Sequence, residues 1–171
     1  YDDIAHYKEH SIEFHILFLQ HLLNNKNVKI LPILTGSPSN YIGVKTTPDS
    51  NEEYNKTITA IKDAIATTGR KVLILSSGDL SHVGRKFGDE FPAATEQIRI
   101  KGEDQLLIEK LSSTDKNAFF TEIAEMADKN RICGSAPFYS ALSLTEADSV
   151  TTAGYNQWHE EETESMVSFA G

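Results

Sequence analysis

The sequence predicts an α/β protein, a layered α/β/α domain with a mostly parallel central sheet. Apolar segments of helical length and of strand length alternate along the chain. The run KVLILSS at 71–77 is short and apolar, like strands that are buried on both faces of a parallel sheet. Polar residues follow it directly, as at the functional strand ends of α/β proteins. The 171 residues are expected to form a single domain, 1–171, with a sizeable core.

The first half of the chain is predicted to contain two helices and, ahead of the run at 71–77, one further strand. Residues 12–23 are apolar on most faces, which predicts a buried helix. Residues 28–34 (VKILPIL) favour a strand, with the proline at an edge or a bulge. Proline and glycine punctuate 37–51, which predicts a loop, and apolar residues recur at helical spacing over 51–68.

The second half is predicted to contain three helices followed by two strands. The helices are expected at 95–111, 115–128 and 137–147, with an N-cap in the short connection before the second of them. An acidic turn separates the closing strands at 150–158 and 166–170, which favours antiparallel pairing of these two.

Charge and cysteine usage limit the classes of partner and of compartment. The formal charge of −9 argues against nucleic acid and anionic membranes, since phosphate groups require a basic surface. No segment is long and apolar enough to cross a membrane, and no signal-peptide pattern opens the chain. A single cysteine excludes an internal disulfide and fits a reducing cytoplasm, the expected location. Because the chain begins at Tyr1 rather than methionine, a fragment or processed product is expected.

Asp79 and His82 lie within one turn of each other, directly after the apolar run at 71–77. A carboxylate can orient an imidazole and raise its basicity, and a histidine held in this way can act as a general base. In the alternative interpretation, Asp79 caps a short turn through its side chain and has no chemical role. The spacing alone leaves both interpretations open.

His10 and Cys133 are the other two candidate site residues. His10 precedes the helix predicted at 12–23, where it could serve only as a local hydrogen-bonding residue. Cys133 precedes a predicted helix and is followed by Gly134, a position that favours the thiolate, although a lone cysteine is often a small buried apolar residue. If the fold brings His10, Asp79, His82 and Cys133 together, they form a mixed N/S/O site for a soft or borderline transition metal.

Three motifs in this order, EHSIE, DLSH and ICG, resemble those of the Memo family (mediator of cell motility). Prokaryotic members of this family are called AmmeMemoRadiSam system protein B. The resemblance covers essentially the whole chain. The matching stretches are EHSIEFHILFLQ at 9–20, SSGDLSHVGRKFGD at 76–89, RICGSAPFYSAL at 131–142 and SMVSFAG at 165–171.

The resemblance implies a fold like that of the class III extradiol dioxygenases, which are non-haem iron enzymes. It also implies a pocket that holds iron or copper through two histidines and one cysteine. Carried over by motif, His10 and Cys133 are metal ligands, and Asp79 and His82 form the acid–base pair. The family's first metal-binding histidine belongs to an N-terminal segment with a Pro-His-Ala-Gly context, which has no counterpart in this sequence.

The sequence therefore predicts a Memo-like protein with a redox-capable iron or copper pocket and an unassigned physiological reaction. One alternative is an adaptor for a peptide or phosphopeptide that keeps a vestigial pocket, although no arginine fork lies near the motifs. Another is a dioxygenase or other oxidoreductase acting on a small aromatic molecule. A thiolate where dioxygenases use a carboxylate is softer and more readily oxidised, which argues against ring cleavage.

Overall fold

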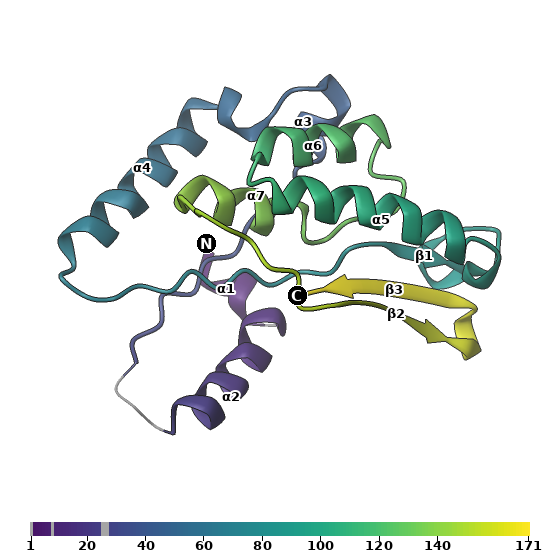
Figure 1. Cartoon of the computed structure of the whole chain (residues 1–171), viewed down its shortest axis with the longest axis horizontal. Coiled ribbons are helices and arrows are strands. Elements are labelled where there is room, and N and C mark those ends of the chain that lie inside the picture. The colour runs from purple at the N-terminus through teal and green to yellow at the C-terminus, as the bar shows by residue number, and fades with distance from the viewer. Residues whose placement is uncertain (1, 8, 25–27) are drawn as a thin grey trace. The chain divides into compact units, whose positions relative to one another are not determined.

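The computed structural model describes residues 2–7, 9–24 and 28–171 of the chain (Figure 1). The chain divides into two compact units, Tyr1–Gly36 and Ser37–Gly171. Each unit is described by itself below. In the part of the chain that the structure describes, no helix combines the length and the apolar character needed to cross a membrane.

The smaller unit contains two helices, α1 (Asp2–His6) and α2 (Ser11–Leu23), followed by extended chain. The predicted helix is confirmed, but its predicted burial is wrong, since none of the thirteen residues of α2 is buried. Phe18 is 69% exposed. A unit of this size has too few residues to enclose an apolar helix, because small chains bury a smaller share of their surface.

Residues 28–34 and 71–77, both predicted as strands, are extended but belong to no sheet. A strand forms only where a neighbouring segment pairs with its backbone N–H and C=O groups, and no described residue pairs with these two segments. The structure has no strand at either segment, and the predicted parallel sheet has no counterpart among the described residues.

The sheet that the structure does contain has three strands, all in the larger unit: β1 (His82–Gly84), β2 (Tyr155–Glu160) and β3 (Ser165–Ala170). Their order is β1–β3–β2, and both pairings are antiparallel. The predicted antiparallel pairing of the two closing strands is therefore confirmed, and the chain is of mixed α/β class.

The predicted helices of the larger unit are confirmed to within a few residues at most boundaries. The two short helices α3 and η1 lie in the region predicted as a loop. The bounds are α3 (Ser39–Val44), η1 (Pro48–Ser50), α4 (Glu52–Thr67), η2 (Arg85–Phe87), η3 (Ala93–Thr95), α5 (Gln97–Ser112), α6 (Lys116–Glu125), α7 (Ser135–Leu144) and η4 (Glu161–Thr163).

Two of these helices begin where a side chain accepts hydrogen bonds from their first free N–H groups. The Asn51 carboxamide oxygen accepts a hydrogen bond from the N–H of Glu53 at 2.8 Å, at the start of α4. The Asp115 carboxylate accepts one from Asn117 at 3.0 Å, at the start of α6. Side chains of this kind compensate for helix N–H groups that have no partner within the helix.

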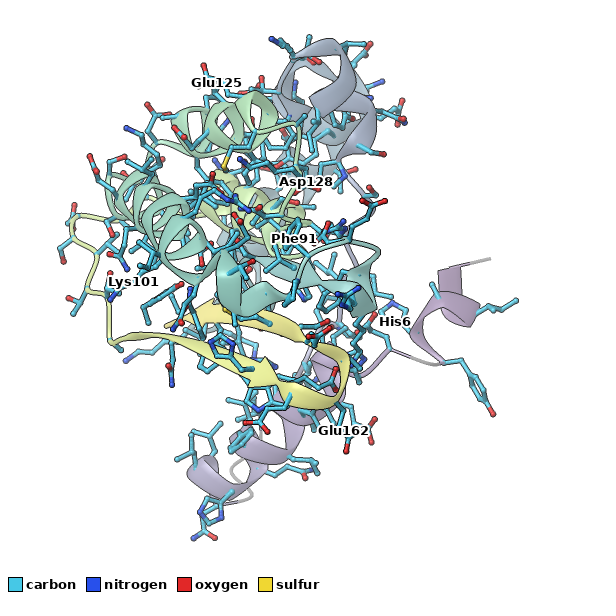
Figure 2. The ribbon with its side chains drawn as sticks, turned by 90° about the vertical axis from the view of Figure 1, so that its right-hand side faces the viewer. His6, Phe91, Lys101, Glu125, Asp128 and Glu162 are labelled. Atoms are coloured by element: carbon cyan, nitrogen blue, oxygen red, sulfur yellow. The ribbon has the colours of Figure 1, made fainter. Side chains whose placement is uncertain are left out.

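Two hydrophobic clusters hold the larger unit together. The first lies where α6 packs against α5 and α7, and its fully buried members are Leu107, Phe119, Phe120, Ile123, Ile132 and Tyr139. The second joins the sheet to α5, and its buried members are Val83, Ala93, Ile100 and Met166. Phe91 packs against this second cluster (Figure 2). The start of β1, which carries His82, therefore lies next to this second hydrophobic cluster.

Candidate metal centre

The structure brings together three of the four candidate site residues that the sequence predicted. Asp79, His82 and Cys133 each offer one donor atom, and these atoms all lie within 4.8 Å of one another. Cys133 is 54 residues away from Asp79 in the chain. The fourth candidate, His10, lies in the smaller unit, immediately before α2. Its part in this cluster stays a prediction.

The segment that carries Asp79 and His82 is fixed by β3. The N–H of Leu80 donates a hydrogen bond to the carbonyl of Ser168 at 2.9 Å. Ser81 binds the same residue twice, by its N–H to the hydroxyl at 2.8 Å and by its carbonyl to the N–H at 2.9 Å. The N–H of His82 donates to the carbonyl of Asn130 at 2.7 Å. Hydrogen bonds to Ser168 and to Asn130 therefore fix the backbone just before β1.

The segment that carries Cys133 approaches this turn closely because each of the two segments has a glycine at the point of contact. The N–H of Gly134 donates to the carbonyl of Asp79 at 2.9 Å. A Cβ atom on Gly78 would lie 2.5 Å from the Cα of Gly134, and one on Gly134 would lie 2.8 Å from the Asp79 carbonyl oxygen. No real Cβ atom tolerates such distances, so this approach requires glycine at both positions, Gly78 and Gly134.

The Cys133 side chain lies against the backbone of Asp79. Its sulfur accepts a hydrogen bond from the N–H of Asp79 at 3.0 Å. Loss of water on the protein-facing side raises the pKa of the Cys133 thiol, and the nearby carboxylates of Asp79 and Asp128 raise it further, against the effect of that hydrogen bond. Backbone N–H groups favour the thiolate, as expected, but burial and the two carboxylates outweigh them in the protein alone. A bound cation reverses this preference, since a coordinating thiol is deprotonated.

The His82 ring is held by two contacts that leave one nitrogen available. Its Nδ1 lies 3.1 Å from the carbonyl oxygen of Leu80, and the ring meets Phe87 edge to face at 5.2 Å. A carbonyl only accepts hydrogen bonds, so this contact assigns the proton to Nδ1 and leaves Nε2 as an acceptor or a metal ligand. His82 Nε2 lies 3.8 Å from Asp79 Oδ2.

This 3.8 Å separation is too long for a hydrogen bond, so Asp79 does not orient His82 by direct bonding in this arrangement. Two donors held about 2.0–2.3 Å from one ion in a tetrahedral site lie about 3.3–3.8 Å apart. The 3.8 Å between His82 Nε2 and Asp79 Oδ2 is at the upper end of this range. Imidazole, thiolate and carboxylate together suit a borderline metal such as iron or copper. The residues present therefore fit the metal that the family resemblance implies.

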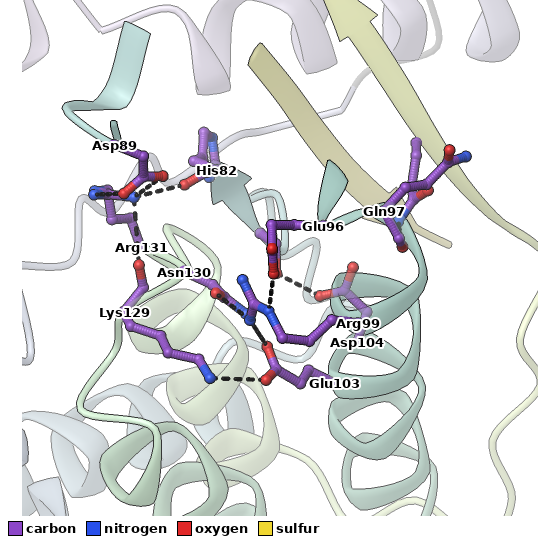
Figure 3. A network of polar contacts seen from close by, with 12 residues as sticks. His82, Asp89, Glu96, Gln97, Arg99, Glu103, Asp104, Lys129, Asn130 and Arg131 are labelled. Carbon is purple, nitrogen blue, oxygen red and sulfur yellow. Dashed lines mark hydrogen bonds and ion pairs between the residues drawn. The ribbon is translucent and has the colours of Figure 1, made fainter. Parts of the chain in front are cut away.

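Arg131 and Asp89, which support the backbone that carries His82, were not identified from the sequence. Arg131, next to the ICG motif, donates a hydrogen bond to the carbonyl of His82 at 3.1 Å and another to Asp89 at 2.8 Å (Figure 3). The hydrogen bond from Arg131 is the main cause of the lowered pKa of Asp89. Asp89 in turn accepts a hydrogen bond from the N–H of Gly84 at 2.9 Å. Both Asp89 and Arg131 lie within the stretches that carry the resemblance, and that position was the available signal.

Comparison with known proteins gives consistent matches. A family model described as Memo-like protein matches residues 1–171. A MEMO1 family protein of Thermococcus kodakarensis is 33% identical over 146 residues, which make up 82% of this chain and 46% of that protein. A MEMO1 family protein of Aquifex aeolicus is 29% identical over 174 residues, covering 100% of this chain and 41% of that protein. One of Pyrococcus furiosus is 32% identical over 139 residues, or 78% of this chain and 43% of that protein.

The chain thus spans less than half the length of these relatives. No solved structure matches it. The family match runs through all three motifs, including those that meet at Asp79, His82 and Cys133. This agreement of motif order, full-length family match and curated relatives confirms the resemblance drawn from the sequence, and the chain belongs to the Memo family.

Proposed function

We propose that this Memo family protein binds iron or copper through Cys133 and His10, with His82 and Asp79 as the acid–base pair beside the metal. The observation that carries the proposal is the convergence of three chemically different donors, from two distant segments, to within 4.8 Å of one another. Thiolate and imidazole donors select borderline and soft metals over magnesium or calcium, which supports iron or copper.

Within this proposal, Cys133 is the anchoring ligand. A thiolate ligand makes the metal redox-tunable, and a bound ion of this kind supplies Lewis acidity and one-electron chemistry. The Asp79 N–H at 3.0 Å from the sulfur would stabilise the thiolate and so tune the metal. His10 enters as a ligand through the family motif, and its role depends on the family resemblance.

His82 and Asp79 are proposed as the acid–base pair of the site. Because His82 Nδ1 is turned toward the Leu80 carbonyl, Nε2 faces the cluster and can accept a proton. The Asp79 carboxylate at 3.8 Å would stabilise the resulting imidazolium by charge. The His82 side chain is only 17% exposed and that of Asp79 is 50% exposed, so bulk water screens this pair incompletely.

The proposal includes a fold for the complete protein. The family resemblance supports a parallel α/β/α sheet like that of the class III extradiol dioxygenases, with 28–34 and 71–77 as two of its strands. The extended backbone of both segments is compatible with this role. Slow amide hydrogen exchange over 71–77 is expected if these residues are paired in the protein, and fast exchange would argue against that sheet.

The decisive experiment is metal analysis of protein purified without oxygen and after reconstitution with iron(II) or copper(I). Stoichiometric metal is expected in the wild type, with loss in Cys133→Ala and in the double variant His10→Ala, Cys133→Ala. His159→Ala is the matched control, because His159 is an exposed histidine on β2 outside the cluster. Full metal content in the double variant, or none in the wild type, would refute the proposal.

A second measurement separates the roles of ligand and of acid–base group. If His82 is an acid–base group, His82→Ala should keep its metal but lose oxygen uptake with a catechol-type substrate. Loss of the metal itself would make His82 a ligand instead. A dioxygenase acting on small aromatics requires uptake in the wild type, and a metal-loaded protein with no uptake would exclude that activity.

A phosphopeptide adaptor has less support from the structure. Two arginines in the matching stretches are already paired with carboxylates, Arg131 with Asp89 and Arg85 with Glu164. A phosphate group would have to displace these partners before it could form the bidentate contacts that tight recognition requires. Titration with phosphopeptides is therefore expected to give no saturable binding.

A further inference from the structure

Helix α5 buries a carboxylate directly behind the candidate metal centre. Asp104 is fully buried, with 0% of its surface exposed. One carboxylate oxygen accepts a hydrogen bond from the hydroxyl of Ser81 at 2.6 Å, and the other accepts one from the hydroxyl of Tyr155 at 2.8 Å. In the described part of the chain, no Lys, Arg or His forms an ion pair with Asp104.

A carboxylate in this setting contributes little to net stability. Burying an acidic group without a cation carries a desolvation cost that two hydroxyl groups offset only in part. An apolar side chain of similar size commonly serves a fold equally well at such a position. Asp104 is therefore better explained by what it holds in place than by the stability that it adds.

Asp104 binds Ser81, which lies in sequence between Asp79 and His82. Ser81 is itself fully buried and lies immediately before His82. Successive side chains of an extended segment point to opposite faces, so a Ser81 side chain fixed toward α5 turns the His82 side chain the other way. The backbone hydrogen bonds of Leu80, Ser81 and His82 hold the path of this segment. The Ser81–Asp104 contact adds a side-chain restraint next to His82, and its loss would loosen the orientation of the imidazole.

The preceding residue of α5 supports His82 by a second route. Glu103 accepts a hydrogen bond from the Asn130 side chain at 2.7 Å, and the Asn130 carbonyl accepts the N–H of His82 at 2.7 Å. Figure 3 shows Glu103, Asp104, Asn130 and His82 in this arrangement. Two consecutive acidic residues of one helix thus hold two consecutive residues of the turn.

We propose that Asp104 is a positioning residue of the metal centre, and that through Ser81 it directs His82 Nε2 toward Asp79 and Cys133. The inference rests on the proposed function for its importance to metal binding, but its structural part can be tested without metal. Tyr155 supplies a matched control, since its hydroxyl binds the same carboxylate from β2 and not from the turn.

The first test is ¹⁵N NMR of the His82 imidazole in metal-free protein, at a pH where the ring is neutral. The wild type is expected to show one tautomer, with the proton on Nδ1, as the contact with Leu80 indicates. Ser81→Ala should show a mixture of both tautomers, whereas Tyr155→Phe should resemble the wild type. Asp104→Asn keeps an acceptor for Ser81 and should preserve the single tautomer, whereas Asp104→Ala should not.

The second test is titration with cobalt(II), followed by the thiolate charge-transfer absorption. Ser81→Ala is expected to bind cobalt about tenfold more weakly, the size of effect usual for groups that support a metal site from outside its ligands, and Tyr155→Phe should bind normally. If Ser81→Ala does not fold, Asp104→Ala against Asp104→Asn makes the same comparison. Equal effects of Ser81→Ala and Tyr155→Phe, or an unchanged tautomer in both Ser81→Ala and Asp104→Ala, would overturn the inference.

The two tests also separate this inference from the proposed function. A wild type that binds no cobalt, with a tautomer that still depends on Ser81, would refute the metal site and leave Asp104 as a residue that positions His82. Normal cobalt binding in all variants would refute the positioning role and leave the metal site intact.

Discussion

Helices α2 and α6 are both rich in large apolar residues, yet they differ completely in burial. Four of the ten residues of α6 are buried, namely Phe119, Phe120, Ile123 and Ala124, whereas none of the thirteen in α2 is. Helix α6 packs against α5 and α7 within one unit, while the smaller unit offers α2 only a five-residue helix and extended chain. Apolar composition therefore shows what a helix can bury, and only neighbouring elements decide whether it does.

The largest effect expected from this comparison is at Phe120. Its side chain is fully buried in the first cluster and meets Tyr139 edge to face at 5.5 Å. Phe120→Ala should lower the free energy of unfolding by about 3–5 kcal/mol, because it removes apolar contacts and leaves a cavity. Urea denaturation measures this directly. A loss below about 1 kcal/mol would mean that the cluster is not the stabilising core of the larger unit.

A smaller effect is expected where the packed region meets the candidate site. Gly134→Ala places a methyl group against the Phe138 ring and the Asp79 carbonyl and should cost about 1–3 kcal/mol, because the ring and the two segments must move apart. It should also make Cys133 react faster with a thiol reagent, since the contact with Asp79 is lost.

Gly102→Ala in α5 is the matched control for Gly134→Ala. A Cβ atom on Gly102 meets nothing within 4 Å, and alanine favours helix. This variant should therefore gain about 0.5–1 kcal/mol. Destabilisation of the same size at both glycines would contradict the close approach as the cause.

The next effect is a dependence of stability on acidity in the larger unit. Burial by itself raises the pKa of Asp49, but hydrogen bonds from Lys116, Thr47 and Asn117 outweigh burial and lower it to about 2. Because the folded pKa is below that of the unfolded chain, the unfolded chain binds more protons in this range. The contribution of Asp49 to the free energy of unfolding is therefore fully present above about pH 4. It should fall by about 1–2 kcal/mol as the pH falls to about 2.

Urea midpoints measured across this range check the contribution of Asp49. Asp49→Asn should remove this part of the pH dependence, and Asp115→Asn, on an exposed capping carboxylate, serves as the control. An unchanged pH profile in Asp49→Asn would contradict the prediction.

The smallest effect is expected at Phe18 on α2. Its side chain is 69% exposed, so Phe18→Ala should change the free energy of unfolding by less than about 0.5 kcal/mol. Urea denaturation alongside Phe120→Ala gives the comparison directly. A loss as large as that at Phe120 would mean that α2 is covered in the protein by a surface that the described residues do not supply.

The same contrast explains which parts of the structure the sequence predicted. Helices α4 to α7 follow from apolar spacing and from local caps such as Asn51 and Asp115, all of which lie within a few residues of one another. The run at 71–77 was predicted as a strand from its own composition. Pairing, however, depends on a second segment, which composition does not reveal.

The candidate site divides in the same way. Asp79, His82 and Cys133 could be predicted because their motifs bring a distinctive chemistry to each position. Asp104 could not, since its role comes from a contact with Ser81 across 23 residues and it lies in none of the matching stretches. Ser168 lies in the stretch at 165–171, but its role depends on a contact with Ser81 across 87 residues. Residues that support a site do so through contacts between distant segments, and local sequence patterns do not identify such contacts.

The crossing of Gly78 and Gly134 also has a practical meaning for protein engineering. These two positions carry no chemistry, yet they set how near the cysteine can come to the turn that bears the histidine. A mutant library aimed at changing metal preference can vary Asp79, His82 and Cys133 freely. The same library should keep both glycines constant, because any replacement there separates the donors before their identity can matter.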